Sequence, residues 1–240
     1  MVNLSVNVNK VATLRNTRDI GIPSPLAAAM ACQAAGAHGI TVHPRPDQRH
    51  IRPADVYELA EAVSVEFNIE GYPAPELLKL VRDVRPTQCT LVPDAPGQFT
   101  SDHGWDVPAN AELLKRVVGE LKSLGIRVSM FMDAEPERIA QAAEVGPDRV
   151  ELYTAGYAHA HQAGDPAAEL ARHVAAAREA ERLGLGVNAG HDLNLDNLGA
   201  FAAAIPNLAE VSIGHALIAD AIFMGLERTV REYLKVLGRA

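Results

Sequence analysis

The stretch Leu183-Gly184-Leu185-Gly186-Val187-Asn188 contains the unit from which we predict the fold of this chain. It closes a helical pattern on a leucine, turns on a glycine and enters a short strand pattern. Glycine suits this turn because it adopts the left-handed backbone conformation that ends a helix. Similar units occur at 35–42, 124–129 and 145–150. A helix-to-strand junction that repeats along the chain predicts alternating helices and strands.

Short apolar runs alternate with longer segments rich in alanine, leucine, glutamate and arginine. A continuous apolar run is typical of a strand buried on both faces, and several longer segments begin with proline, which helices favour in their first turn. We predict strands at 4–8, 39–43, 66–70, 89–92, 127–132, 149–153, 186–188 and 210–213. We predict helices at 25–35, 54–64, 75–82, 109–124, 136–145, 166–183, 195–203 and 218–238, the last interrupted near Met224-Gly225 and therefore readable as two helices.

The repetition predicts an α/β fold in which residues 1–240 form a single (β/α)8 TIM barrel domain with extra helices. Such barrels typically contain roughly 250 residues, close to the length of this chain. An open, doubly wound parallel sheet is the main alternative. Its nucleotide-binding versions are disfavoured, because neither G-x-G-x-x-G after the first predicted strand nor G-x-x-x-x-G-K-[ST] occurs.

The composition narrows the class of function. A net charge of −8 without a long basic run argues against a nucleic-acid or anionic-membrane surface, but it permits a small anionic substrate. The N-terminus lacks the pattern of a secretory signal, and no apolar run approaches the roughly 20 residues of a membrane span. Cys32 and Cys89 are predicted to be reduced core thiols. These features favour a cytoplasmic protein.

Polar residues gather where the predicted strands end, which is where TIM barrels carry their active sites. Glu70 ends the third predicted strand, and we expect a raised pKa that suits a general base, although a salt bridge to a barrel arginine is the alternative. Any single histidine could instead be a loop or core residue. The other candidates at these ends are Asn7, Asn9, Lys10, His43, His50, Glu151, Thr154, Asn188, His191 and His215, whereas His38, His103, His159, His161 and His173 are expected at the surface.

Two regions predict anion sites. Gly190-His191 and Gly214-His215 follow the last two predicted strands, and glycine there exposes backbone N–H groups ahead of a helix. After the second predicted strand, Arg45, Arg49, His50 and Arg52 form a cationic cluster, which could also be a solvated basic loop. Two anion sites at one barrel mouth indicate a bisphosphate or two phosphorylated substrates.

These motifs together resemble the pyridoxine 5′-phosphate synthase (PdxJ) family. The resemblance covers essentially the whole chain, in order and with the family's spacing. It is carried by Asn7-Val8-Asn9-Lys10-Val11-Ala12-Thr13-Leu14-Arg15-Asn16, Gly39-Ile40-Thr41-Val42-His43-Pro44-Arg45-Pro46-Asp47-Gln48-Arg49-His50-Ile51, Phe67-Asn68-Ile69-Glu70, Val187-Asn188-Ala189-Gly190-His191 and Ile213-Gly214-His215-Ala216.

The resemblance implies a cofactor-free condensation of 3-amino-2-oxopropyl phosphate with 1-deoxy-D-xylulose 5-phosphate to pyridoxine 5′-phosphate, phosphate and water. It also implies a homo-octamer and a lid at 93–108 that brings Thr100 to the substrates. The implied roles are proton acceptors at His43 and Glu70, a proton donor at His191, and a group that stabilises transition-state charge at Glu151. The pentulose phosphate would be held by Arg45, His50 and Thr100, and the aminoketone phosphate by Asn7, Arg18, Gly214 and His215.

The chain departs from the family pattern at three positions. After the first predicted strand the family has Asn-x-Asp-His, and this chain has Asn9 and Lys10 in place of the acid and the histidine. After the seventh, Asp192 replaces the glycine of His-Gly-Leu. We expect subfamily variants that keep the reaction and use all three positions in substrate binding, with Lys10 adding positive charge at the pentulose phosphate.

Two other functions remain compatible with the residues. His43, Glu70, His191 and His215 are side chains that could bind a metal, as in a metal-dependent TIM-barrel hydrolase or isomerase acting on a phosphorylated small molecule. However, the first strand lacks a His-x-His pair, and we expect no metal. A non-catalytic phosphate sensor would be expected to lack the proton-transfer residues, which are present.

Overall fold

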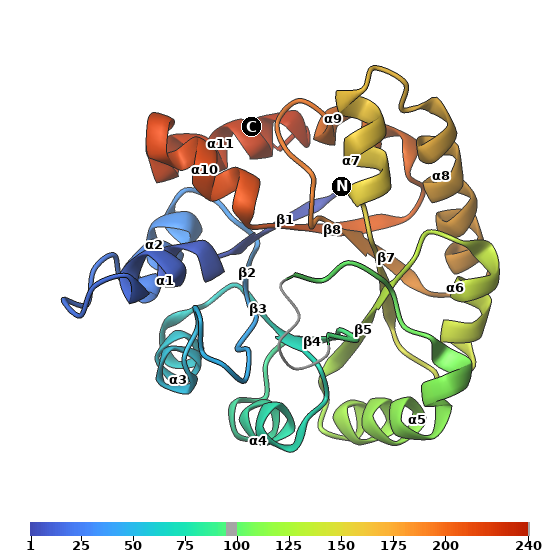
Figure 1. The fold of residues 1–240 in the computed structure, drawn as a ribbon, viewed down its shortest axis with the longest axis horizontal. Coiled ribbons are helices and arrows are strands. Elements are labelled where there is room, and N and C mark those ends of the chain that lie inside the picture. The colour runs from blue at the N-terminus through green and yellow to red at the C-terminus, as the bar shows by residue number, and fades with distance from the viewer. Residues whose placement is uncertain (95–99, 240) are drawn as a thin grey trace.

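Eight parallel strands close into a barrel in the order in which they occur along the chain, as predicted (Figure 1). The computed structural model describes residues 1–94 and 100–239. The barrel closes where β1 pairs with β8, with Ser5 opposite Ser212. The strands are β1 (Asn3–Asn7), β2 (Gly39–Val42), β3 (Glu66–Gly71), β4 (Gln88–Leu91), β5 (Arg127–Met132), β6 (Arg149–Leu152), β7 (Gly186–Ala189) and β8 (Leu208–Ile213).

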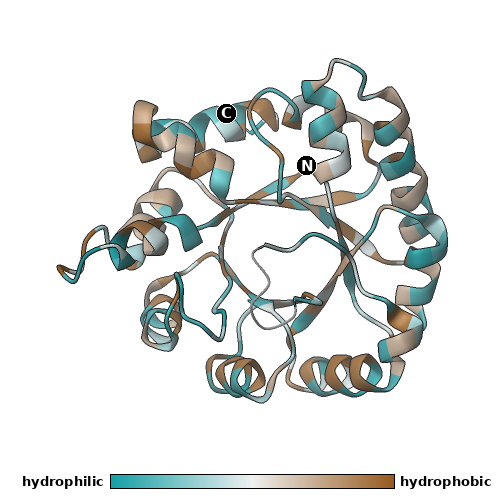
Figure 2. Ribbon diagram, in the orientation of Figure 1, coloured by the Kyte–Doolittle hydropathy of each residue, from teal (hydrophilic) through white to brown (hydrophobic). Residues whose placement is uncertain are grey.

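Helices form a ring around the barrel (Figure 1). They are α1 (Asn9–Asn16), α2 (Pro25–Ala34), α3 (Pro53–Ala62), α4 (Pro75–Val84), α5 (Val107–Ser123), α6 (Pro136–Ala143), α7 (Ala155–Gln162), α8 (Ala167–Arg182), α9 (Leu198–Ala204), α10 (His215–Met224) and α11 (Leu226–Val236). In Figure 2 these helices are brown on part of their surface and teal on the rest, as amphipathic helices are. Within residues 1–94 and 100–239, no helix is both long enough and apolar enough to cross a membrane.

The structure adds two helices that the sequence did not predict, α1 and α7. Helix α1 starts two residues after β1 ends, and no side chain caps its first turn, so the sequence lacked the usual signal of a helix start. Helix α7 contains His159 and His161, which the sequence placed in a surface loop. The predicted break near Met224-Gly225 is confirmed, because Gly225 has a φ of +82° and separates α10 from α11.

His173 was wrongly predicted to be solvated. It lies in α8 and is only 2% exposed. Its two ring nitrogens lie 2.8 Å from the carbonyl oxygen of Glu169 and 3.0 Å from that of Tyr153. Both ring nitrogens thus face main-chain carbonyl oxygens inside the protein, and His173 is a core residue.

The strands have one apolar face and one polar face, whereas the sequence predicted strands that are apolar on both faces. Residues such as Leu4, Val6 and Ile40 are fully buried in the apolar core. The interior of the barrel is polar instead. Hydrogen bonds there join Ser5 to Thr41, Thr90 to Asn68, Asn188 to Gln88 and Gln88 to Glu210, all of them buried.

A buried ion pair fixes the segment that follows β2. Arg15, in the last turn of α1, pairs with both carboxylate oxygens of Asp55 in α3. Arg15 also donates to the carbonyl oxygen of His50 at 3.1 Å, and Asn16 donates to the same oxygen at 2.8 Å. The side chains of Arg15 and Asp55 are 9% and 10% exposed, so removing one leaves an almost buried charge on the other.

Replacing Asp55 with leucine is therefore expected to lower the free energy of unfolding by about 3–5 kcal/mol, because the Arg15 charge stays buried without its partner. Urea denaturation of the wild type and the variant measures this loss. The double variant Arg15→Met/Asp55→Leu is the control, and it should recover much of the stability. A double variant that is as unstable as the sum of both single variants would contradict this account of the pair.

Candidate active site

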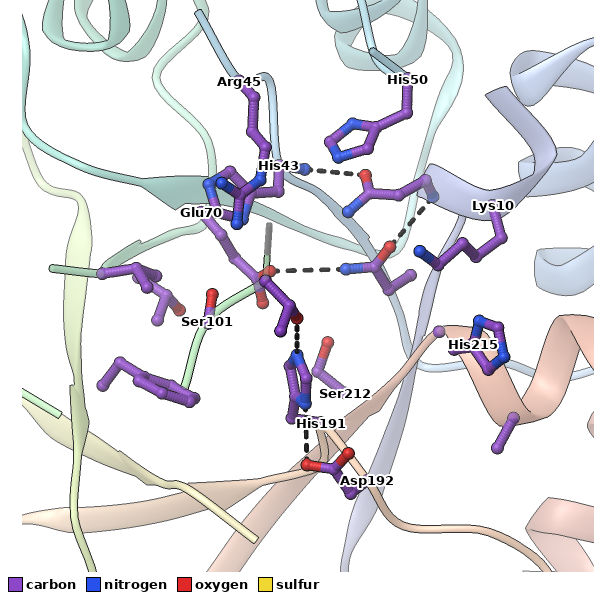
Figure 3. Close-up of a pocket in the computed structure, with 18 of the residues that line it drawn as sticks. Lys10, His43, Arg45, His50, Glu70, Ser101, His191, Asp192, Ser212 and His215 are labelled. Carbon is purple, nitrogen blue, oxygen red and sulfur yellow. Dashed lines mark hydrogen bonds and ion pairs between the residues drawn. The ribbon is translucent and has the colours of Figure 1, made fainter. Parts of the chain in front are cut away.

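A cavity of about 700 Å³ opens at the carboxyl ends of the strands. Figure 3 shows Lys10, Glu70 and His191 pointing into one common space from three different parts of the barrel. Most predicted site residues line the cavity: Asn7, Asn9, Lys10, His43, Arg45, His50, Glu70, Thr100, Glu151, His191, Asp192, Gly214 and His215. Thr154 and Asn188 are fully buried and do not line it. Arg18 is exposed, just beyond the end of α1. Arg52, from the predicted cationic cluster, is exposed at the start of α3 and is not among the lining residues.

Glu70 stands near the end of β3, where the amides of Asn7 and Asn68 each donate to its carboxyl group at 3.4 Å. Burial raises its pKa well above the usual range, and the nearby carboxyl groups of Glu151, Glu210 and Asp94 raise it further. The Arg45 guanidinium opposes this rise. The expectation of a raised pKa is confirmed, and the cavity therefore holds Glu70 as a neutral acid while no further cation lies beside it.

Glu151 projects from β6 and is 4% exposed. Within the described residues, no group donates a hydrogen bond to its Oε2 atom. Burial, together with the charge of Glu210, raises the pKa of Glu151 to about 8, against a smaller opposing effect of His191. Since Glu210 was not among the predicted residues and lies beneath the cavity in β8, the sequence missed one member of this carboxyl cluster.

His43 follows β2 and is held through its backbone. Its N–H donates to Asn9 Oδ1 at 2.9 Å, and the N–H of Asn9 donates to Asn7 Oδ1 at 3.0 Å. Burial lowers the pKa of His43 well below its usual value, and the positive charges of Arg45 and neighbouring groups lower it further. His43 is thus a neutral imidazole, which can accept a proton.

One wall of the cavity is cationic. Its cations are Lys10, Arg45 and Arg49, and the neutral ring of His50 lies among them. Burial lowers the pKa of His50 to about 4, and the charges of Arg45, Lys10 and Arg49 contribute to this shift. Arg45 pairs with Asp94, whose Oδ2 also accepts from Ser101 Oγ at 2.8 Å. This wall has the charge and the donors to hold a phosphate group.

His191 stands after β7, opposite that wall. One ring nitrogen, Nδ1, lies 2.8 Å from Asp192 Oδ2, and the other, Nε2, lies 3.2 Å from Thr100 Oγ1. The backbone before it is tight, because a Cβ atom on Gly190 would lie 1.9 Å from the carbonyl oxygen of Ser212. Only glycine fits at position 190, and this fixes where His191 enters the cavity.

A helix begins at the mouth beside the end of β1. Gly214 precedes α10, and Gly214, His215 and Ala216 all line the cavity. The unpaired N–H groups of a first helical turn attract anions. A Cβ atom on Gly214 would lie 3.1 Å from that of Asn7, so a larger residue would crowd this corner.

Several lining residues were not predicted, and most of them belong to no motif. Ser212 and Thr90 could have been found, because the two-residue period of a strand places them on the inner face of β8 and β4. Within residues 1–94 and 100–239, no group of three or more His, Cys, Asp or Glu side chains could hold a metal ion. The predicted lid at 93–108 includes residues 95–99, which lie outside the described residues, and its last part, from Val107, is the start of α5. The additional lining residues are Thr13, Thr90, Val92, Ser101, Phe131, Asn194, Ser212 and Ala216.

Comparison with known proteins gives one consistent result. Residues 4–239 match the family model described as pyridoxal phosphate biosynthesis protein PdxJ. Pyridoxine 5′-phosphate synthase from Bacteroides thetaiotaomicron is 56% identical over 237 residues, covering 99% of this chain and 100% of the relative. The protein of the same name from Porphyromonas gingivalis is 54% identical over 233 residues, covering 97% of this chain and 98% of the relative.

Among solved structures, phosphoribosyl anthranilate isomerase from Thermotoga maritima is similar in fold. The TM-score is 0.66 at 13% sequence identity, with 100% of both chains covered. At this identity the likeness concerns the barrel alone.

Replacing Glu151 with glutamine should stabilise the protein increasingly as the pH rises from 5 to 8. The folded protein keeps this carboxyl protonated up to about pH 8, whereas the unfolded chain ionises it above about pH 4.3. The wild type therefore binds more protons when folded, and this group makes its stability fall as the pH rises through that window. Urea unfolding at pH 5, 6.5 and 8 measures the difference. A gain that is equal at all three pH values would contradict the raised pKa.

Proposed function

The chain belongs to the PdxJ family of pyridoxal phosphate biosynthesis proteins, and we propose that its cavity joins 3-amino-2-oxopropyl phosphate to 1-deoxy-D-xylulose 5-phosphate. The products are pyridoxine 5′-phosphate, phosphate and water, so the protein is a pyridoxine 5′-phosphate synthase of vitamin B6 biosynthesis. The observation that carries this reaction is a single cavity with cationic side chains on one side, the first turn of a helix on another, and buried acids and bases between them. A metal-dependent hydrolase or isomerase is not favoured, because the curated relatives carry the synthase name over nearly their whole length.

The cationic wall is the proposed site of the pentulose phosphate. Arg45 and His50 would hold it with Thr100, and Lys10 adds a charge that already acts on His50. The side chain of Asn9 also contacts a catalytic candidate, because its Oδ1 atom accepts a hydrogen bond from the backbone N–H of His43. The proposal for Asn9 is therefore that it orients His43 as well as lining the phosphate site.

The opposite corner is the proposed site of the aminoketone phosphate. The first turn of α10, with Gly214 and His215, offers N–H groups to an anion. Asn7 lies between this corner and Glu70, to which its amide donates. That position suits a residue that contacts the bound aminoketone close to the reacting carbon atoms.

The proton-transfer roles follow from opposite pKa shifts. His43 has its pKa lowered well below neutral and is a ready acceptor. The hydrogen bond and charge of Asp192 raise the pKa of His191 above its usual value, which favours the protonated form that a donor needs. Burial and the neighbouring carboxyl groups raise the pKa of Glu70, so its proposed role as a base begins when a cation such as the substrate ammonium lies beside it and lowers that pKa. Glu151, deeper in the barrel, would stabilise positive charge in the transition state once it ionises.

The proposed assembly is a homo-octamer. Large apolar side chains are exposed on α1, on the segment between α1 and α2, and on α10, where Phe223 is 89% exposed. Exposed apolar residues on adjoining elements indicate a protein interface. Arg18 lies in the same region and does not line its own cavity, so its proposed role at the aminoketone phosphate would be played in a neighbouring subunit.

The proposed location is the cytoplasm. Cys32 and Cys89 are free and buried, and burial raises the pKa of each thiol to about 12, which keeps them inert. The proposed reaction needs no cofactor or metal, since proton transfers suffice for its imine formation, eliminations and ring closure.

Incubating the purified protein with both substrates should yield pyridoxine 5′-phosphate and inorganic phosphate, measured by chromatography and a phosphate assay. Glu70→Gln should lower kcat by about 10²–10⁴-fold, because it removes one proton acceptor while leaving both phosphate sites intact. Glu76→Gln, an exposed glutamate at the start of the next helix, is the matched control. Absence of product from the wild type would refute the proposed reaction, and full activity of Glu70→Gln would refute the base.

Light scattering of the purified protein should give the mass of an octamer, about eight times 25.6 kDa. Phe223→Glu should shift the protein to smaller species, because a charge at the centre of an apolar contact must be desolvated. Glu227→Gln, on the exposed face of α11, should leave the mass unchanged. A wild type that is monomeric at all concentrations would contradict the proposed assembly.

A further inference from the structure

Asp192 is paired with His191, and only one of the two ring nitrogens of this histidine faces the cavity. Its Oδ2 lies 2.8 Å from Nδ1 of His191, while Nε2 of the same ring is turned to the cavity and lies 3.2 Å from Thr100 Oγ1 (Figure 3). The carboxylate can only accept, so the proton on Nδ1 must be on the histidine side of this bond. The nitrogen that meets the substrate is then Nε2.

The loop that carries Asp192 is fixed on both sides. The N–H of Asp192 donates to Thr154 Oγ1 at 3.2 Å, and Thr154 is fully buried. The carbonyl oxygen of Asp192 accepts from the amide of Asn197 at 3.4 Å, and Asn197 is 1% exposed. The N–H of Leu193 closes a turn onto the carbonyl oxygen of Gly190 at 2.7 Å. With its backbone held in this way, Asp192 presents its carboxylate to the ring from a constant position.

Neighbouring elements hold the ring itself. Phe131 from β5 and Tyr153 after β6 meet the imidazole edge to face, with ring centroids 6.4 and 6.0 Å away. The two aromatic rings therefore flank the imidazole, and Asp192 determines which of its nitrogens carries the proton.

We propose that Asp192 is a positioning residue for the proton donor: it holds His191 in the Nδ1–H tautomer and stabilises the charged ring until Nε2 gives its proton to the substrate. This inference rests on the proposed function, and it replaces the expectation that Asp192 binds substrate directly. A residue that acts through another in this way changes the rate of proton transfer and not the affinity for substrate.

The charges around His191 support the assignment. Burial lowers the pKa of His191, but the hydrogen bond and charge of Asp192 raise it, and Glu151 and Asp94 add to the rise, so that it lies above the usual value. Glu151 is largely neutral at pH 7 because its own pKa is about 8. Asp94 is paired with Arg45, and His43 across the cavity is neutral. Among these described neighbours, Asp192 is therefore the one whose negative charge is not offset.

Nuclear magnetic resonance of protein labelled with ¹⁵N-histidine tests the pair without any substrate. Above its pKa, His191 of the wild type should be the Nδ1–H tautomer, and Asp192→Asn should lower this pKa by roughly one unit. Loss of one signal in His191→Gln identifies the resonance. Asp196→Asn removes an exposed carboxylate from the same loop and should leave His191 unchanged. An unchanged pKa and tautomer in Asp192→Asn would overturn the inference, whether or not the proposed reaction is found.

Steady-state kinetics of Asp192 variants provide a second test of the proposal. Asp192→Asn should lower kcat by about 10–100-fold and leave the KM of both substrates within about twofold, since only part of the donor's contribution is lost. The protonated donor is the active form, so activity falls as the pH rises past its pKa. The alkaline limb of the kcat profile should therefore move to lower pH in Asp192→Asn, and Asp192→Glu should restore part of the rate. A raised KM with unchanged kcat would overturn the inference in favour of direct substrate binding.

An inactive wild type would refute the proposed function. The resonance experiment would still decide whether Asp192 sets the tautomer and the pKa of His191. A loss of activity caused by misfolding is recognised by thermal unfolding, in which Asp192→Asn should melt close to the wild type.

Discussion

The apolar packing of the outer faces of the strands against the helices stabilises the closed barrel, and the polar interior depends on it. Side chains such as Leu4, Val6 and Ile40 are removed from water on that side and stabilise the closed sheet. The inner faces are thereby free to carry polar residues, which most barrels of this class fill with branched apolar ones. Ser5, Thr41 and Asn68 hydrogen-bond to inner-face neighbours across the strands instead. At the carboxyl ends of the strands, inner-face residues such as Glu70, Thr90 and Ser212 also line the cavity.

The same enclosure explains why similar side chains have different properties. His43 and His191 are both buried, and burial lowers the pKa of each. The charge of Arg45 lowers the pKa of His43 further, whereas Asp192 touches His191 and raises its pKa, so the two histidines are shifted in opposite directions. Glu70, Glu151 and Glu210 are held close together in a poorly solvated space and repel one another's charge. A barrel that buries its acids and bases can thus separate their protonation states without a metal ion.

The parts of the fold that depend on local sequence were predictable. Glycine at Gly125, Gly146 and Gly184 ends a helix whatever happens elsewhere, and the positive φ angles found there explain why the repeat predicted the barrel. The ends of the strands likewise predicted the ionisable residues that line the cavity, such as Glu70, His43 and His191. His173 was wrongly placed at the surface because it packs against another element, where one ring nitrogen meets the carbonyl oxygen of Tyr153. For the same reason neither the role of Asp94 beside Arg45 nor the distance of Arg18 from the cavity could be deduced without the folded chain.

Gln88 lies at the centre of the polar interior and meets residues from strands far along the chain. Its side chain accepts from Asn188, 100 residues away, and donates to Glu210, 122 residues away. An apolar core tolerates a change of shape at one position if a neighbour shifts, but a buried hydrogen bond loses its value when either partner changes. Drift at these positions is therefore epistatic: a substitution at one is neutral only on a background in which the others have already changed. The polar interior should accordingly evolve by rare, joint steps, while the helices around it vary one residue at a time.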